Sequence, residues 1–212
     1  MKKTIIFSIL IILIAVLFSA VLYSHIPNQM ISHWNFAGEP DGYMPKYIGL
    51  FLMPLISIAA LFLFILLPKI DPLKKNVKKF ENYYYIFIFV FILFLFYLHI
   101  VSILLNLGIN LNIIHFIIPG FTALLYFMGF LTEKAKQNWF IGIKTPWTLS
   151  NEQVWNKTHK LGGLLFKCSA AIALFGLIFP IYASYFIIAP LILSIISLFF
   201  YSYWTYRNLN SK

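Results

Sequence analysis

The segment YYIFIFVFILFLFYLHIVSILL, from Tyr84 to Leu105, contains no Asp, Glu, Lys or Arg. Its length matches the roughly 20 apolar residues that an α-helix needs to cross the hydrocarbon core of a bilayer. The rest of the chain has the same character, since 61% of its 212 residues are hydrophobic and only 10% are charged. Soluble domains average about 25% charged residues. The segment therefore predicts a membrane-spanning helix in an integral membrane protein.

Five other segments share this length and composition. With the first, the predicted spans are Thr4–Ser24, Tyr47–Leu67, Tyr84–Leu105, Ile113–Leu131, Leu164–Tyr182 and Tyr185–Tyr203. The first span follows two lysines, as a secretory signal does, but its apolar run is too long and no small-residue cleavage site follows. We therefore expect an all-α integral membrane protein with six transmembrane helices, including a retained first helix.

The distribution of lysine predicts the orientation. Lysines gather at Lys2 and Lys3 and in two connections, Lys69–Lys79 and Lys134–Lys160, whereas the alternate connections carry only Lys46. The positive-inside rule then places both termini and the two Lys-rich loops in the cytoplasm of a multi-pass plasma-membrane protein. Membrane lipids with anionic headgroups account for the net charge of +10. We expect no direct nucleic-acid partner, because no basic stripe with base-stacking aromatics accompanies the lysines.

The order of spans and loops suggests a division of the chain. Residues 1–68 are a two-span unit with an outer loop motif at 25–47, residues 69–83 are a Lys-rich cytoplasmic loop, and residues 84–212 are a four-span unit with a cytoplasmic motif at 133–163. The single cysteine, Cys168, excludes an intrachain disulfide and a cysteine-based metal site.

The outer loop reads HIPNQMISHWNFAGEPDGYMPKY, from His25 to Tyr47. Its Gly-Glu-Pro-Asp-Gly run favours turns and excludes a helix, so we expect a compact, ordered loop. One interpretation is an interfacial cap in which Trp34, Tyr43 and Tyr47 lie at headgroup level. The other is a lip that binds a ligand.

The histidines of the outer side have two possible functions, a metal site and a pH-sensing site. His25 and His33 have acidic neighbours, but their spacing fits no standard zinc motif. We therefore expect no metal and no other cofactor. His99 and His115 lie near the predicted outer ends of spans three and four, so a pH-responsive cluster is an alternative to separately hydrated histidines.

The inner loop, Glu133–Gly163, contains a helix-start signal. Ser150 is the expected N-cap and Gln153 stands at the capping-box position. Trp155 and His159 share one face of the helix that follows. The loop is interpreted either as an interfacial helix anchored by aromatics or as a docking platform for a cytoplasmic protein. We expect no enzyme activity, because Ser150 and His159 stand too far apart along one helix to act as nucleophile and base.

Both loops resemble sequence patterns of one family. The outer string IPNQMISHWNFAGEPDGYMPK (Ile26–Lys46) resembles a domain of unknown function at the N-terminus of many bacterial and archaeal membrane proteins. The inner string NWFIGIKTPWTLSNEQVWNKTHKLGG (Asn138–Gly163) resembles the second pattern of the SdpI family, the immunity proteins against the sporulation-delay toxin. The resemblance covers essentially the whole chain and implies six spans with inside termini.

The resemblance implies a double role. The best-known member of the family is similar to an immunity protein that protects against a secreted toxic peptide, and to a receptor that captures a cytoplasmic winged-helix repressor at the membrane. Carried onto this chain, the toxin-facing residues are His33, Trp34, Gly38, Glu39, Asp41 and Lys46. The partner-facing residues on the cytoplasmic side are Asn138, Gly142, Lys144, Thr145, Pro146, Trp155 and His159. The family often has Arg at Lys144 and Lys160, so the planar guanidinium fork is absent here.

Three hypotheses of function follow. The first is a membrane immunity or sensor protein that is not an enzyme. The alternative is a small membrane transporter or channel, but transporters usually place ionisable groups within their spans, and the span centres here are nearly bare of them. The third is a membrane metalloenzyme that uses His25 and His33.

Overall fold

The computed structural model describes residues 2–109 and 112–210. Six helices in these ranges are long and apolar enough to cross a membrane, which confirms the six-span prediction. They are α1 (Lys2–Leu22), α2 (Lys46–Ile70), α4 (Glu81–Asn106), α5 (Ile113–Lys134), α7 (Glu152–Ala173) with its extension α8 (Phe175–Ile178), and α9 (Ala183–Asn210) preceded by the 3-10 helix η1 (Pro180–Tyr182). The helix that contains the fifth predicted span, Leu164–Tyr182, begins at Glu152, because the inner-loop helix continues into it without a break.

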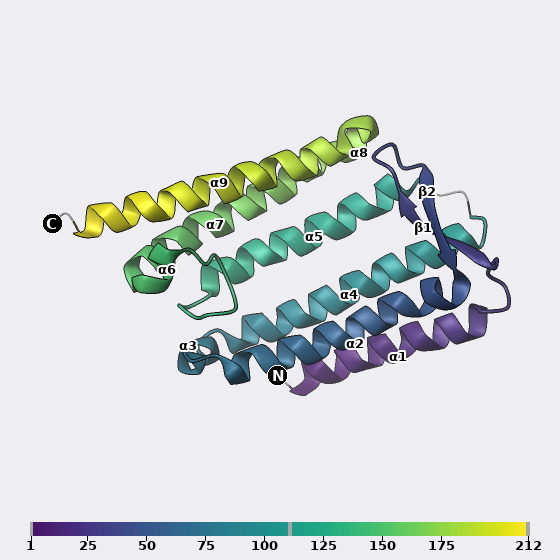
Figure 1. The fold of residues 1–212 in the computed structure, drawn as a ribbon, viewed down its shortest axis with the longest axis horizontal. Coiled ribbons are helices and arrows are strands. Elements are labelled where there is room, and N and C mark those ends of the chain that lie inside the picture. Colours follow the sequence, from purple (N-terminus) through teal and green to yellow (C-terminus); the bar gives the residue numbers. More distant parts are fainter. Residues whose placement is uncertain (1, 110–111, 211–212) are drawn as a thin grey trace.

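The long helices form two groups of three. Helices α1, α2 and α4 pack on one another, α7 packs between α5 and α9, and the contact of α4 with α5 joins the groups (Figure 1). The division of the chain at residues 69–83 stays a prediction, and in the fold α4 packs on both helices that precede this loop.

The two ends of the bundle carry different structures. A small hairpin of β1 (Gln29–Trp34) and β2 (Pro40–Pro45) covers one end, and the short helices α3 (Lys74–Lys78) and α6 (Pro146–Ser150) lie at the other (Figure 1). The chain begins and ends toward the α3 and α6 end. We call the hairpin end outer and the opposite end inner, following the orientation that the lysines predict.

Close contact between α5 and α7 fixes the inner half of the bundle. A Cβ on Gly163 of α7 would lie 2.6 Å from the carbonyl oxygen of Gly129 on α5. Small residues let two membrane helices approach this closely. Across the same interface the Lys167 ammonium lies 2.6 Å from the Glu133 carboxylate. The middle of α7 is therefore held closely against α5.

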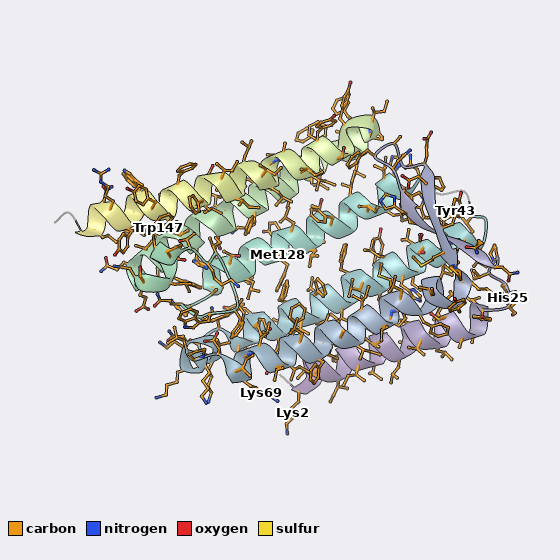
Figure 2. The ribbon with its side chains drawn as sticks, in the orientation of Figure 1. Lys2, His25, Tyr43, Lys69, Met128 and Trp147 are labelled. Carbon is orange, nitrogen blue, oxygen red and sulfur yellow. The ribbon has the colours of Figure 1, made fainter. Side chains whose placement is uncertain are left out.

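A buried polar contact joins the three helices of the other group. The Ser19 hydroxyl on α1 donates to the Leu50 carbonyl on α2 and lies 3.0 Å from Nε2 of His99 on α4. His99 is 1% exposed, so it is not part of a hydrated outer cluster. The imidazole is buried because α1 and α2 both cover this turn of α4. Large apolar side chains project outward along the bundle, as contact with lipid requires (Figure 2).

Candidate functional site

The outer loop is a twisted β-hairpin. Strands β1 and β2 pair antiparallel, with shifts in register on both sides of His33. Gly42 lies opposite this position, where a Cβ would come within 2.8 Å of the His33 Cβ. The sequence predicted a compact loop but not its strands, because β2 contains two prolines and a glycine, which are depleted in strands.

The tip of the hairpin is shaped by Asn35 and Gly38. The Asn35 side-chain oxygen accepts hydrogen bonds from the backbone N–H groups of Ala37 and Glu39, at 2.9 and 3.0 Å. Gly38 has φ +82° and its Cα faces Ile114 of α5, 3.2 Å from where a Cβ would lie. The tip therefore needs glycine for both conformation and space. Asn35 was not among the expected site residues, although an Asn ahead of a glycine turn is a recognisable signal.

Asn106, at the end of α4, fixes the hairpin to the bundle. Its Oδ1 accepts from the Ile31 N–H at 2.7 Å, and its Nδ2 donates to the Ile31 carbonyl at 3.2 Å. The side-chain amide thus makes the two hydrogen bonds to Ile31 that the backbone of a neighbouring strand would make. Met30 beside it is buried against Leu50 and Ile103. Sequence reasoning missed Asn106, whose only signal is a polar side chain at the end of an apolar run.

The predicted toxin-facing residues divide by exposure. His33 and Asp41 form an exposed hydrogen-bonded pair, with Nδ1 and Oδ1 2.5 Å apart. Lys46 donates to the Ile26 carbonyl, so its ammonium is held against the hairpin. The exposed residues of the set are His33, Glu39 and Asp41, and the half-buried ones are Trp34, Gly38 and Lys46. In the described part of the chain, no three His, Cys, Asp or Glu side chains lie where they could hold a metal ion.

An apolar groove lies between the hairpin tip and the outer end of α9. Its volume is about 550 Å³. Phe36 of the tip is 74% exposed, and Ile181 across the groove is 80% exposed. The lining residues are Phe36, Ala37, Ile181, Tyr182, Ser184, Tyr185, Ile188, Ala189 and Ile192. Sequence reasoning did not connect the hairpin with this last helix, because the two segments lie far apart along the chain.

The inner loop turns around the buried side chain of Asn138. Its Oδ1 accepts from the backbone N–H groups of Phe140 and Ile141, and its Nδ2 donates to the carbonyls of Lys136 and Ile141. All four bonds are between 2.6 and 2.9 Å long. Asn138 therefore satisfies the backbone of the turn rather than facing a partner.

Two contacts tie the inner loop to the α2–α3 connection. The buried carboxylate of Asp71 accepts from the N–H groups of Leu73 and Trp139, at 2.7 and 2.9 Å. Asn76 donates to the Gln137 carbonyl at 3.0 Å. Neither Asp71 nor Asn76 was among the expected residues, because nothing in the sequence indicates which loop a carboxylate at the end of a span will meet.

His159 holds the loop against α7. Its Nε2 accepts from the Ile143 N–H, and its Nδ1 lies 2.9 Å from the Trp155 carbonyl oxygen. A backbone N–H can only donate and a carbonyl can only accept, so the ring is neutral with its proton on Nδ1. The ring stacks on the Trp155 indole with centroids 3.8 Å apart. Gly142, at φ +119°, passes so close that a Cβ there would collide with the imidazole.

The short helix α6 begins with a capping box that was not expected. Thr145 accepts from the Thr148 N–H, and Thr148 accepts from the Thr145 N–H. Thr145 also donates to Ser202 of α9 at 3.1 Å. The prediction of Ser150 as N-cap is wrong. Ser150 ends α6, and the Asn151 side chain caps α7 by accepting from the N–H groups of Gln153 and Val154.

The predicted partner-facing residues therefore have two roles. Gly142, Lys144 and Pro146 are exposed, whereas Asn138, Thr145, Trp155 and His159 are buried. Trp155 is fully buried and not an interfacial anchor of the helix, and its indole N–H donates to the Ala135 carbonyl under the loop. The buried four residues build the loop, and the exposed three lie on its rim.

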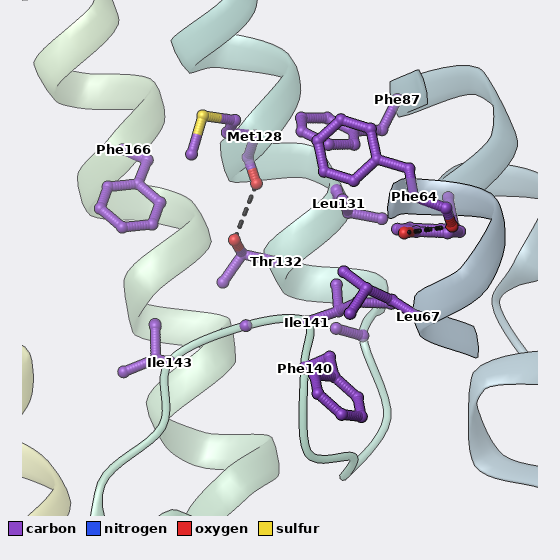
Figure 3. Close-up of a pocket in the computed structure, with 13 residues that line it drawn as sticks. Phe64, Leu67, Phe87, Met128, Leu131, Thr132, Phe140, Ile141, Ile143 and Phe166 are labelled. Atoms are coloured by element: carbon purple, nitrogen blue, oxygen red, sulfur yellow. Dashed lines mark hydrogen bonds between the residues drawn. The ribbon is translucent and has the colours of Figure 1, made fainter. Parts of the chain in front are cut away.

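A cavity of about 280 Å³ lies under the inner loop, between the two helix groups. Figure 3 shows aromatic and aliphatic side chains from α2, α4, α5 and α7 around it, with Phe140, Ile141 and Ile143 of the loop closing one side. The Tyr84 hydroxyl donates to the Phe64 carbonyl and Thr132 donates to the Met128 carbonyl. The hydroxyls at the wall thus already have backbone partners, and the space presents an apolar surface.

The fold and these two ordered loops define a multi-pass plasma-membrane protein. Residues 134–203 match the SdpI/YfhL protein family, and residues 10–58 match a domain of unknown function, DUF1648. The chain is 28% identical to Immunity protein SdpI of Bacillus subtilis (strain 168), over 213 aligned positions that cover 100% of both chains. These matches confirm the resemblance to the SdpI family that the two motifs predicted. No solved structure matches the chain.

Proposed function

We propose that this chain is a membrane immunity protein that protects its cell against a secreted toxic peptide and is not an enzyme. The proposal is supported by its full-length similarity to an immunity protein. The observation that carries it furthest is the outer hairpin, which is fixed to α4 by Asn106 and to α5 by Gly38. A loop anchored at two helices presents one defined surface to the outside of the cell.

The toxin-binding surface in this proposal is the groove between the hairpin tip and α9. Its exposed apolar side chains suit a membrane-active peptide, because burial of about 25 cal/mol per Å² of apolar surface supplies the binding energy. Exposed His33, Glu39 and Asp41 lie on the same hairpin and supply polar contacts at its edge. Exposed apolar surface rimmed by polar residues is typical of an interaction site.

Survival of a toxin-sensitive bacterium that expresses the protein tests this proposal. Cells are challenged with the sporulation-delay toxin, and membrane levels of each variant are measured by immunoblot. Phe36→Asp places a charge in the groove and should abolish protection. Tyr43→Asp is the matched control, because Tyr43 is also an exposed hairpin aromatic but does not line the groove (Figure 2).

Each result has a separate meaning. If wild-type protein reaches the membrane but gives no protection, immunity to this toxin is refuted. If wild type protects and Phe36→Asp protects equally well, the groove is not the binding surface. Equal loss in both variants would indicate that the whole hairpin, rather than the groove, is required.

We further propose that the rim of the inner loop captures a cytoplasmic winged-helix repressor when toxin is bound. The proposal is supported by the exposure of Lys144 and Pro146 on a loop that contacts both helix groups, through Asp71 on one side and His159 on the other. Because the loop contacts both groups of helices, its conformation would change if the two helix groups shifted relative to one another.

Recruitment of a fluorescent repressor to the membrane tests the second role. Lys144→Glu should prevent recruitment in toxin-treated cells while leaving protection intact. Lys160→Glu makes the same charge reversal at an exposed position on α7, outside the rim, and should recruit normally. Recruitment that is unchanged by Lys144→Glu would contradict the assignment of the rim as the docking surface.

A further inference from the structure

A basic pocket lies at the inner end of the bundle, where α2 ends and α4 begins. Its volume is about 280 Å³. Lys69 enters it from the end of α2, and Lys74 and Lys78 enter from α3. Figure 2 places Lys69 at this end of α2. The remaining lining residues are Pro68, Val77, Glu81, Tyr84 and Tyr85.

The three lysines have no ion-pair partner in the described part of the chain. The contacts there between basic and acidic side chains are His33–Asp41 and Lys167–Glu133, and both lie outside the pocket. Asp71 lies close in sequence, but its carboxylate is 2% exposed and turned toward the N–H groups of Leu73 and Trp139. Glu81 is the only acidic residue that lines the pocket. An excess of positive charge therefore faces a defined space.

The position of the pocket indicates what fills it. It lies beside the last turn of one predicted span and the first turn of the next, and the orientation that the lysines predict places it at the depth of lipid headgroups on the inner side. Its floor is apolar, since Pro68, Val77 and Tyr84 contribute to it. Basic pockets between membrane helices on the cytoplasmic side suit anionic lipid headgroups. A zwitterionic choline lipid fits poorly, because its ammonium would meet the three lysines.

We propose that this pocket is a specific site for one anionic phospholipid of the inner leaflet. The phosphate is held by Lys69, Lys74 and Lys78, and the acyl chains extend along the apolar surface of α2 and α4. This differs from the diffuse attraction of any Lys-rich loop to a charged membrane, because the ligand occupies one pocket with a fixed set of contacts.

Matched variants distinguish a pocket from diffuse attraction. The test variant is Lys69→Gln, Lys74→Gln and Lys78→Gln combined. The control variant is Lys136→Gln, Lys157→Gln and Lys160→Gln combined, which removes the same charge from exposed positions of the inner loop that do not line the pocket. Melting curves in detergent without added lipid verify that both variants fold.

Native mass spectrometry of purified full-length protein measures the binding of dioctanoyl-phosphatidylglycerol and dioctanoyl-phosphatidylcholine. Wild type should bind one phosphatidylglycerol in preference to phosphatidylcholine. The affinity of the test variant for phosphatidylglycerol should be about 100-fold lower, because each of the three lysines contributes roughly fivefold to the affinity. The control variant should bind as wild type does. Equal loss in both variants, or equal binding of the two lipids by wild type, overturns the proposal.

Two further measurements complete the test. Inorganic phosphate at the same concentration should not displace bound phosphatidylglycerol, and displacement would assign the site to free phosphate and overturn the lipid as ligand. If the triple variant does not fold, Lys74→Gln alone should weaken phosphatidylglycerol about fivefold, with Lys157→Gln as its control. Unchanged binding by Lys74→Gln would then refute the pocket.

Discussion

The contact of His159 with the inner loop gives a sharp prediction. In His159→Phe the ring remains, so the stack on Trp155 is kept, but the acceptor for the Ile143 N–H is lost. His159 is 1% exposed, so water cannot take the place of the imidazole nitrogen without opening the loop. The variant therefore removes the two hydrogen bonds of the imidazole, to Ile143 and to the Trp155 carbonyl, while keeping the packing of the ring.

The expected cost follows from leaving a buried donor without a partner. Such a loss destabilises the closed loop by about 1–3 kcal/mol. A value near 2 kcal/mol raises the equilibrium constant for opening of the loop by about 30-fold. If the loop and the bundle unfold together, the melting temperature should fall by roughly 4–8 °C. If the loop opens alone, amide exchange near Ile143 should rise and the melting temperature should change little.

Hydrogen exchange with mass spectrometry of the purified protein distinguishes these results. Peptides that cover residues 138–145 should exchange about 30-fold faster in His159→Phe, while the outer hairpin should be unchanged. His115→Phe is the control, because His115 is exposed and lies on α5 at the outer end. If exchange at residues 138–145 and the melting temperature both match wild type, the loop does not depend on this bond and the reasoning is refuted.

Three other variants test the contacts that position the loops. Gly163→Ala places a Cβ 2.6 Å from the Gly129 carbonyl oxygen, so it should lower stability by about 1–3 kcal/mol; an unaltered melting temperature would contradict the close packing. Asp71→Ala removes the acceptor for the Trp139 N–H, and exchange at residues 137–141 should rise by about 5- to 150-fold. Asn106→Leu removes both bonds to β1, so exchange at residues 29–34 should rise and toxin protection should fall at equal membrane level; a rigid, protective hairpin would show that Asn106 is dispensable.

The positions of the spans could be predicted because each depends on a property of the local chain. A run of apolar residues long enough to cross a bilayer must become a helix there, since every backbone N–H and C=O needs a partner within the segment. The inner end of the fifth span was harder to place from the sequence. The start of α7 exposes Gln153, Asn156 and Lys160 on one side, which indicated a helix outside the span, while Trp155 and His159 on the opposite side pack beneath the inner loop.

The candidate site could be predicted only in part. Periodicity put Trp155 and His159 on one face of a helix, but not whether that face would be exposed or buried. The turn residues of the outer loop excluded a helix, but the attachment of the hairpin to the bundle depends on Asn106, which is 75 residues from its partner Ile31. The Asp71 contact with Trp139 spans 68 residues.

The sequence by itself determined six apolar spans, a lysine distribution that orients them, and two polar loops with the family patterns. These follow from composition and short-range spacing. Only the tertiary structure decided which polar groups form the hydrogen bonds that hold the loops in place and which face the solvent. The reason is physical: each buried donor or acceptor must find a partner, and the partner is set by helix packing that brings distant segments together. Packing therefore buried Asn138, Thr145, Trp155 and His159 and left Lys144 on the rim.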